Sequence, residues 1–192
     1  MNTRFNSHLV IVFALEHYNP LNMIRAFGEQ GIYPVYVSVK RRYETACRSK
    51  YISTLHRVDS VEEGYQLVME KYGNEELKPY IVFSDDKSVG YFDLHYDEWK
   101  DKFITYNAGK AGRINEFMDK FEIQRLAKKH GFNVLDSYVI GKTDALPENL
   151  WYPVITKAIS PNSGSWKGDV FICLDEQELR EAIEKIESPQ IM

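Results

Sequence analysis

The chain has 192 residues, of which 44% are hydrophobic and 27% are charged, a composition typical of one large or two small globular domains. Its formal net charge of -4 disfavours general binding to a nucleic-acid backbone. Cys47 and Cys173 lie far apart and in no metal-binding spacing, which predicts a reducing compartment, no zinc site and a buried Cys173. The first apolar run, at 9–15, is too short to cross a bilayer, so we expect a cytoplasmic protein outside the membrane.

Apolar runs alternate with helical patterns through the first half of the chain. The runs expected to be strands are 9–15, 34–39, 55–58 and 80–83, and helical patterns follow the first, third and fourth of them. Strands that alternate with helices predict a parallel, doubly wound sheet. Residues 1–112 are therefore expected to form a Rossmann-like α/β domain.

The second part of the chain predicts a smaller α+β domain at 113–192, after a polar linker. We expect one long helix from 114 to a stop at Gly131, and a last helix at 175–186 with a capping-box-like start. The expected strands are 134–140, 154–158 and 169–174. A further strand begins near the last residues, so we interpret the chain as a piece of a longer protein.

Several common nucleotide and catalytic motifs are absent from the sequence. The first strand is followed by Leu15-Glu16-His17-Tyr18-Asn19-Pro20, without the Gly-x-Gly-x-x-Gly turn of dinucleotide-binding folds. The chain has no P-loop and no Gly-x-Ser-x-Gly elbow, and its five histidines are scattered. No metal site is predicted.

The most informative segment is a lysine-bearing strand that leads into a small polar loop. Lys157 lies near the end of Tyr152-Pro153-Val154-Ile155-Thr156-Lys157-Ala158, and neighbouring residues of a strand face opposite ways. The loop at 160–169 has two glycines, hydroxyl groups and a second cation, and such loops can wrap phosphate oxygens. A plain hairpin with an exposed lysine is the alternative, and composition alone favours it.

The order of these segments resembles that of the ATP-grasp family. The run Met118-Asp119-Lys120-Phe121-Glu122-Ile123-Gln124-Arg125-Leu126 is similar to the opening helix of an ATP-grasp domain, and 152–158 is similar to its lysine strand. The loop at 160–169 stands where that family has its glycine-rich flap. The first half, with Ser84-Asp85-Asp86-Lys87-Ser88-Val89, resembles the pre-ATP-grasp domain of carbamoyl-phosphate-synthase large-subunit-like proteins.

This resemblance implies an ATP-dependent ligase that activates a small-molecule carboxylate as an acyl phosphate for attack by an amine or a related nucleophile. It places phosphate contacts at Lys120, Lys157, Ser163, Gly164 and Ser165, with Lys167 as an additional cation. The Mg²⁺ ligands and the adenine-binding hinge of the family would follow Met192. The chain would therefore carry the phosphate-side half of an ATP site and be inactive alone.

The carboxyl edge of the first sheet is expected to bind the other substrate, because ligands of open α/β sheets collect there. Glu16, Asp85 and Asp86 are the candidates at this edge. For Asp85 and Asp86, helix capping is the favoured alternative.

Two other functions stay open at this stage. One is a non-catalytic α/β module that binds a nucleotide or metabolite or acts in regulation, and the other is half of a sugar- or nucleotide-binding transferase. The sequence specifies neither the carboxylate and nucleophile nor the oligomeric state.

Overall fold

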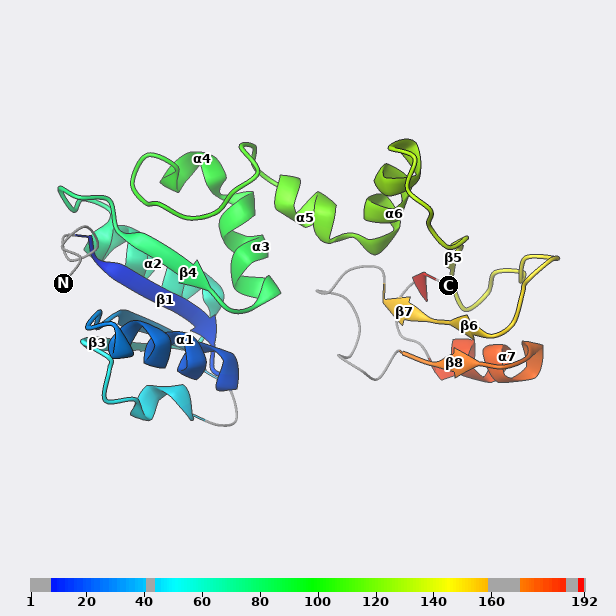
Figure 1. The fold of residues 1–192 in the computed structure, drawn as a ribbon, viewed down its shortest axis with the longest axis horizontal. Coiled ribbons are helices and arrows are strands. Elements are labelled where there is room, and N and C mark those ends of the chain that lie inside the picture. Colours follow the sequence, from blue (N-terminus) through cyan, green and yellow to red (C-terminus); the bar gives the residue numbers. More distant parts are fainter. Residues whose placement is uncertain (1–7, 41–43, 159–169, 186–189, 192) are drawn as a thin grey trace. The chain divides into compact units, whose positions relative to one another are not determined.

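The computed structural model describes residues 8–40, 44–158, 170–185 and 190–191, which belong to two compact units at 1–114 and 115–192. Figure 1 shows the order of the elements in each unit. Within the described ranges, no helix is both long and apolar enough to cross a membrane.

The first unit contains a four-stranded parallel sheet. Its strands are β1 (Val10–Leu15), β2 (Val35–Val39), β3 (Thr54–Val58) and β4 (Tyr80–Phe83), in the order β3-β2-β1-β4. Phe13 in β1 lies opposite Val37 of β2 on one side and Phe83 of β4 on the other. The central strands β1 and β2 are buried almost throughout, as continuous apolar runs in a sheet covered on both faces require. The predicted α/β fold with a parallel sheet is confirmed.

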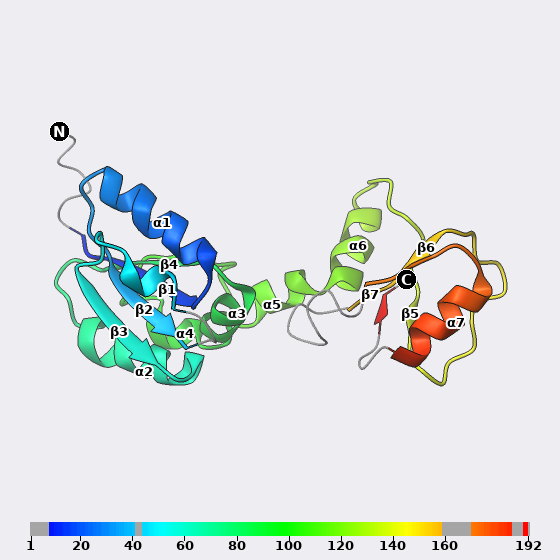
Figure 2. The same ribbon diagram turned by 90° about the horizontal axis from the view of Figure 1, so that it is seen from below.

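Helices cover both faces of this sheet, with α1 and α2 on opposite sides (Figure 2). On one face, α1 packs on a cluster that includes Val12, Ile24 and Tyr36. On the other face, α2 approaches so closely that a Cβ added at Gly64 would lie 2.7 Å from Cζ of Phe13. The helices of this unit are α1 (Tyr18–Glu29), the 3-10 helix η1 (Ala46–Arg48), α2 (Val61–Tyr72), α3 (Asp86–Leu94) and α4 (Tyr96–Trp99).

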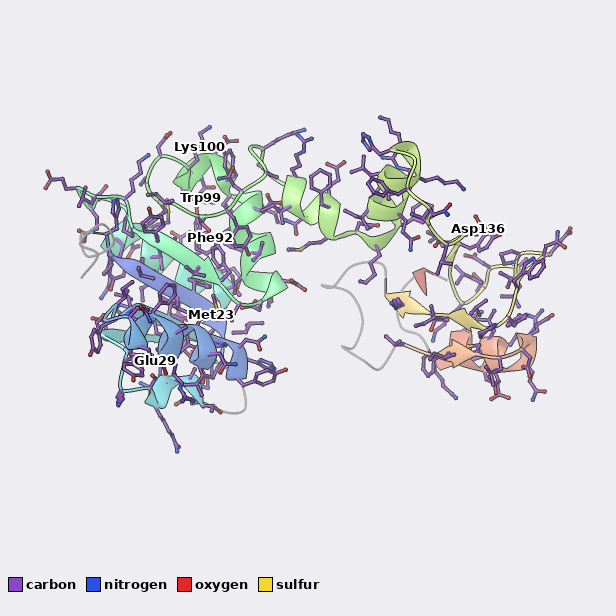
Figure 3. The ribbon with its side chains drawn as sticks, viewed as in Figure 1. Met23, Glu29, Phe92, Trp99, Lys100 and Asp136 are labelled. Atoms are coloured by element: carbon purple, nitrogen blue, oxygen red, sulfur yellow. The ribbon has the colours of Figure 1, made fainter. Side chains whose placement is uncertain are left out.

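An aromatic cluster fills the layer under α3 and α4. Phe92 lies 4.7 Å from Phe83 and 5.1 Å from Phe13 between ring centroids. The indole N–H of Trp99 donates to the backbone carbonyl of Phe92 at 2.6 Å, so the buried polar atom of this ring is satisfied (Figure 3).

The second unit contains short antiparallel strands. They are β5 (Val139–Ile140), β6 (Val154–Ile155), β7 (Lys157–Ala158), β8 (Ile172–Cys173) and β9 (Gln190–Ile191). β9 lies between β5 and β7, and β6 pairs with β8. The described strands are shorter than the ranges 134–140 and 169–174 that the sequence predicts, and residue 169 lies outside the described part of the chain.

The single long helix expected at 114–131 is wrong. The segment forms two helices, α5 (Arg113–Met118) and α6 (Lys120–Lys129), and Asp119 between them has extended backbone angles, φ -67° and ψ 119°. Its carboxylate accepts hydrogen bonds from the backbone N–H groups of Phe121 and Glu122 at 2.8 and 3.0 Å. An aspartate that caps the next helix in this way cannot also continue the preceding one, because the cap requires a non-helical backbone.

The helix α7 (Glu176–Lys185) packs against strands of both sheets of this unit. Leu179 and Ile183 of α7 pack with Ile140 and Cys173 of the strands in one buried cluster, which confirms the predicted burial of Cys173. The capping-box-like start of this helix is also confirmed, because the carboxylate of Asp175 accepts from the N–H of Glu178 at 2.9 Å. Because successive strand residues point to opposite faces, the neighbours Val139 and Ile172 point away from this cluster.

Candidate functional site

The lysine strand alternates as its sequence predicts. Thr156 is fully buried, and its hydroxyl accepts a hydrogen bond from the backbone N–H of Phe171 at 3.1 Å. Lys157, the next residue, is exposed. Because successive strand residues point to opposite faces, the bonds that hold Thr156 also direct Lys157 to the other face of the sheet.

Exposed apolar side chains surround Lys157 on that face. Val139 and Lys157 are both register partners of Ile191, so they share one face, and Ile155 shares it because it lies two residues before Lys157. Ile155 is paired with Ile172 of β8, which is 68% exposed. The exposed side chains of Val139, Ile155 and Ile172 are therefore apolar, and they lie on the side of their strands opposite to the cluster that packs with α7. An apolar sheet face with one cation suits a ligand that has an apolar body and a negative charge.

A cavity of about 440 Å³ opens beside Lys157. This volume lies within the range of about 300–1,000 Å³ that is usual for small-molecule sites. Helix α6 contributes one wall, the segment before β5 a second, and the segment that leads into β6 a third. The lining residues are Gln124, Leu135, Asp136, Ser137, Tyr138, Asn149, Leu150, Trp151, Pro153, Val154, Ile155 and Lys157.

The cavity is lined by polar as well as apolar side chains. Among the described lining residues, Lys157 is the one lysine or arginine, and Asp136, labelled in Figure 3, is the one carboxylate. Asp136 is 82% exposed at its side chain and lies 3.8 Å from the ammonium of Lys128. Gln124 has its Oε1 buried, and this atom has no hydrogen-bond partner among the described residues. The described lining thus offers a cation, a carboxylate, and hydroxyl and amide groups beside apolar side chains.

Lys120 is the first residue of α6 and directly follows its capping Asp119. It stands four residues before Gln124, so the two side chains emerge from the same side of the helix one turn apart. Lys120 itself is not among the residues that line the cavity. The structure therefore brings Lys157 together with Gln124, and Lys120 stands one helical turn from that wall.

The remaining predicted phosphate contacts lie outside the described residues. They are Ser163, Gly164, Ser165 and Lys167 in the loop after β7. Their role stays a prediction. The described residues also contain no group of three or more His, Cys, Asp or Glu side chains that could hold a metal ion.

Glu16, at the carboxyl end of β1, is a buried hydrogen-bond centre with 2% exposure. Its carboxylate accepts from the hydroxyl of Tyr36 at 2.5 Å, from the hydroxyl of Ser38 at 3.0 Å and from the backbone N–H of Ala46 at 2.5 Å. The thiol of Cys47 lies 3.5 Å from the same carboxylate. These bonds join β1 and β2 to η1, so Glu16 is engaged within the protein.

The burial of this cluster shapes the acidity of its neighbours. Burial raises the pKa of Tyr36 far above its ordinary value, and the hydrogen bond to Glu16 and the charge of Glu16 raise it further. Burial also raises the pKa of the Cys47 thiol, against a smaller lowering effect of the hydrogen bond to Ser38. Both groups are therefore protonated at neutral pH, and Cys47 has little of the thiolate that a nucleophile requires.

Asp85 caps the helix α3, which confirms the favoured capping interpretation for this residue. Its carboxylate accepts from the backbone N–H and the hydroxyl of Ser88 at 2.8 and 2.9 Å, and from the N–H of Leu15 at 2.8 Å. The last bond ties the end of β1 to the start of α3. Asp86 lies in the first turn of α3 with its side chain exposed, so it is the carboxylate at this edge that a ligand can reach.

Sequence reasoning missed most of the cavity wall. Gln124 is separated from Lys157 by more than thirty positions, and its one visible signal is the spacing of four from Lys120. Trp151 stands just before the lysine strand and is 89% exposed, and a large exposed aromatic ring next to a conspicuous lysine was a usable signal.

The fold and the cavity together define an α/β protein with a parallel-sheet domain, followed by a small antiparallel part that presents a lysine. The same arrangement of elements occurs in part of several solved ligase and synthetase structures. No family model matches the chain, and no curated protein sequence is similar to it.

Solved structures show the likeness. An L-amino acid ligase from Bacillus licheniformis matches with a TM-score of 0.71 at 10% identity over 96% of this chain and 43% of its own. An N5-carboxyaminoimidazole synthetase from Staphylococcus aureus gives 0.61 at 16% identity over 95% of this chain and 46% of its own. A phosphoribosylglycinamide synthetase from Anaerococcus prevotii gives 0.52 at 15% identity over 96% and 45%. The chain spans less than half the length of these proteins, and at such identities the likeness shows the fold alone.

Proposed function

We propose that the chain is the N-terminal part of an ATP-dependent ligase that joins a carboxylate to an amine or related nucleophile through an acyl phosphate. The solved proteins that share its fold are themselves named as ligases and synthetases. The observation that carries the proposal is Lys157, which is exposed and lines a cavity large enough for a small molecule. A carbamoyl-phosphate-synthase-like branch and a cytoplasmic location belong to the same proposal.

In this function, Lys157 binds phosphate oxygens. Its ammonium is a mobile point charge with three donors, which suits oxygens whose positions shift during phosphoryl transfer. The nucleotide, when bound, supplies the phosphoryl group that activates the carboxylate. The chain contributes positioning and charge neutralisation, which are the protein's main tasks in phosphoryl transfer.

Lys120 and the loop at 160–169 are assigned to the same phosphates. Lys120 stands at the start of α6, where the helix dipole also favours negative charge. Ser163, Gly164, Ser165 and Lys167 are assigned to the flap that closes over the nucleotide. The Mg²⁺ ligands are assigned to the part of the whole protein that corresponds to the remaining length of the matched structures.

The carboxyl edge of the first sheet is assigned to the small-molecule substrates. Glu16 and Asp85 are occupied by hydrogen bonds within the protein, so we assign them to the support of this edge. Asp86, which is exposed in the first turn of α3, is the carboxylate assigned to substrate contact.

The experiment is a titration of the isotope-labelled chain with millimolar ATP, followed by NMR shifts of the second unit. The variant Lys157→Met keeps most of the aliphatic stem and removes the charge. We expect it to weaken binding by at least about tenfold, because a charged hydrogen bond contributes about 1.5–3 kcal/mol. Lys129→Met, at an exposed lysine in the last turn of α6, is the matched control and should bind as the parent does. Equal affinities for the parent and Lys157→Met would refute the assigned role of Lys157, and the absence of any binding would refute the ATP half-site.

A further inference from the structure

We propose that a second cavity of the second unit binds a small zwitterion with an apolar body, such as an amino acid with a large apolar side chain. The cavity has a volume of about 320 Å³ and is lined by helix α6 and by residues 134–138. It adjoins the cavity beside Lys157, with which it shares Gln124 and residues 135–138, but Lys157 does not line it. The inference is independent of the proposed function, because it requires no nucleotide and uses a site apart from the sheet edge assigned to the substrates.

Charged side chains of both signs line this second cavity. Arg125 and Lys128 are three positions apart on α6, so they emerge from one side of the helix. Asp136, labelled in Figure 3, belongs to the other segment and is the one carboxylate among the described lining residues. A site with cations on one segment and an anion on the other attracts both charges of a zwitterion, whereas a ligand with a single charge is attracted to one segment and repelled by the other.

Ion pairs within the protein leave these charges able to bind a ligand. Arg125 donates from Nε and Nη2 to the same oxygen of Glu122, at 2.8 and 2.7 Å, and a guanidinium has five N–H donors. The ammonium of Lys128 lies 3.8 Å from the carboxylate of Asp136, which is too long for a hydrogen bond. These two side chains are 73% and 82% exposed, so the charged groups of a ligand stay partly hydrated beside them and the cost of desolvation stays low.

Apolar side chains of the same cavity define the body of the ligand. Phe121, Val134, Leu135 and the ring of Tyr138 line it. Leu135 is 81% exposed and Tyr138 is 39% exposed, so a ligand that covers them removes apolar surface from water. The volume lies near the lower end of the usual range for small-molecule sites, about 300–1,000 Å³, which suits a ligand the size of an amino acid with an aromatic or branched side chain.

Three ligands that share a phenyl ring test the need for both charges. Phenylalanine is the zwitterion, 3-phenylpropanoate lacks the ammonium, and phenethylamine lacks the carboxylate. Each is titrated into the isotope-labelled chain and followed by NMR. We expect phenylalanine to bind about threefold or more tightly than either analogue, the effect of one partly exposed ion pair. Its shifts should lie mainly in residues 121–128 and 134–138.

Two variants assign each charge of the ligand to its partner. Asp136→Asn should weaken the binding of phenylalanine and phenethylamine about threefold and leave that of 3-phenylpropanoate unchanged. Arg125→Gln combined with Lys128→Gln should weaken phenylalanine and 3-phenylpropanoate and spare phenethylamine. Lys129→Gln and Glu148→Gln are the matched controls, because these side chains are exposed and line neither cavity, and they should bind all three ligands as the parent does.

The pattern across the ligands and variants decides the inference. Equal affinities of the parent for all three ligands, no binding of phenylalanine, or shifts centred on Lys157 would refute the zwitterion site. Equal losses for phenethylamine and 3-phenylpropanoate in Asp136→Asn would refute the assignment of charges. Should a variant not fold, the order of the three affinities in the parent decides. None of these results depends on ATP, so the proposed function stands or falls by its own titration.

Discussion

Replacement of Glu16 distinguishes an internal support from a substrate-binding carboxylate. The structure gives this side chain three hydrogen bonds of 3.0 Å or less, from Tyr36, Ser38 and the backbone of Ala46. Glu16→Ala removes the acceptor that the Tyr36 and Ser38 hydroxyls and the Ala46 N–H share. Glu16→Gln keeps one oxygen for the Ala46 N–H, and the two hydroxyls can rotate to accept from its amide nitrogen.

The expected loss follows from these contacts. A buried donor that loses its acceptor costs about 1–3 kcal/mol, and removing the buried carboxylate from the interior offsets part of the summed loss. We therefore expect Glu16→Ala to reduce the free energy of unfolding of the first unit by about 3 kcal/mol, and Glu16→Gln by about 1–2 kcal/mol. With a urea m-value of about 2 kcal/mol/M, the alanine variant would unfold about 1.5 M earlier.

The assay is urea unfolding followed by the fluorescence of Trp99, which is buried in the first unit. Trp151 and Trp166 are replaced by phenylalanine so that the signal reports on this unit alone. Glu29→Ala, at the exposed end of α1, is the control and should change stability by less than about 0.5 kcal/mol. A loss below about 1 kcal/mol in Glu16→Ala would refute the support role and return Glu16 to the candidates for substrate contact.

Two other predictions concern local chemistry. Asp119→Ala should speed amide hydrogen exchange in the first turn of α6, because it removes a cap that contributes about 1 kcal/mol. Asp119→Asn should not speed this exchange, and equal exchange rates in the two variants would contradict the capping role of Asp119. The Cys47 thiol should react with an aromatic disulfide reagent at least about fivefold more slowly than free cysteine at pH 7, because its raised pKa lowers the fraction of thiolate. As the pH rises, the reaction rate should increase only above the ordinary pKa of a thiol. Reaction at the free-cysteine rate near neutrality would contradict the burial of this thiol.

Local patterns determined the elements of the first unit. Continuous apolar runs predicted its central strands, because a strand covered on both faces needs apolar residues at every position. The cap of α3 at Asp85 followed from a short side chain that bonds a backbone N–H group three residues on. The alternation of Thr156 and Lys157 was also local, since a strand turns successive side chains to opposite faces.

Local patterns misled where two of them competed. The spacing of apolar residues from Ile114 to Phe121 predicts one helix, and the cap chemistry of Asp119 predicts a new start. The cap prevailed because its carboxylate bonds two backbone N–H groups that a continuing helix would have bonded itself.

Only the tertiary structure decided what the candidate residues contact. Glu16 receives its hydrogen bonds from residues that lie 20 to 30 positions further along the chain, a distance at which no sequence pattern shows a partner. The cavity likewise combines Gln124 of α6 with Trp151 and Lys157 from the strand region. The sequence by itself determined the order of the elements and the lysine that marks the site, because both depend on short-range geometry. The support role of Glu16 and the wall that contains Gln124 emerged only on folding, because hydrogen bonding and packing between distant segments depend on the whole fold.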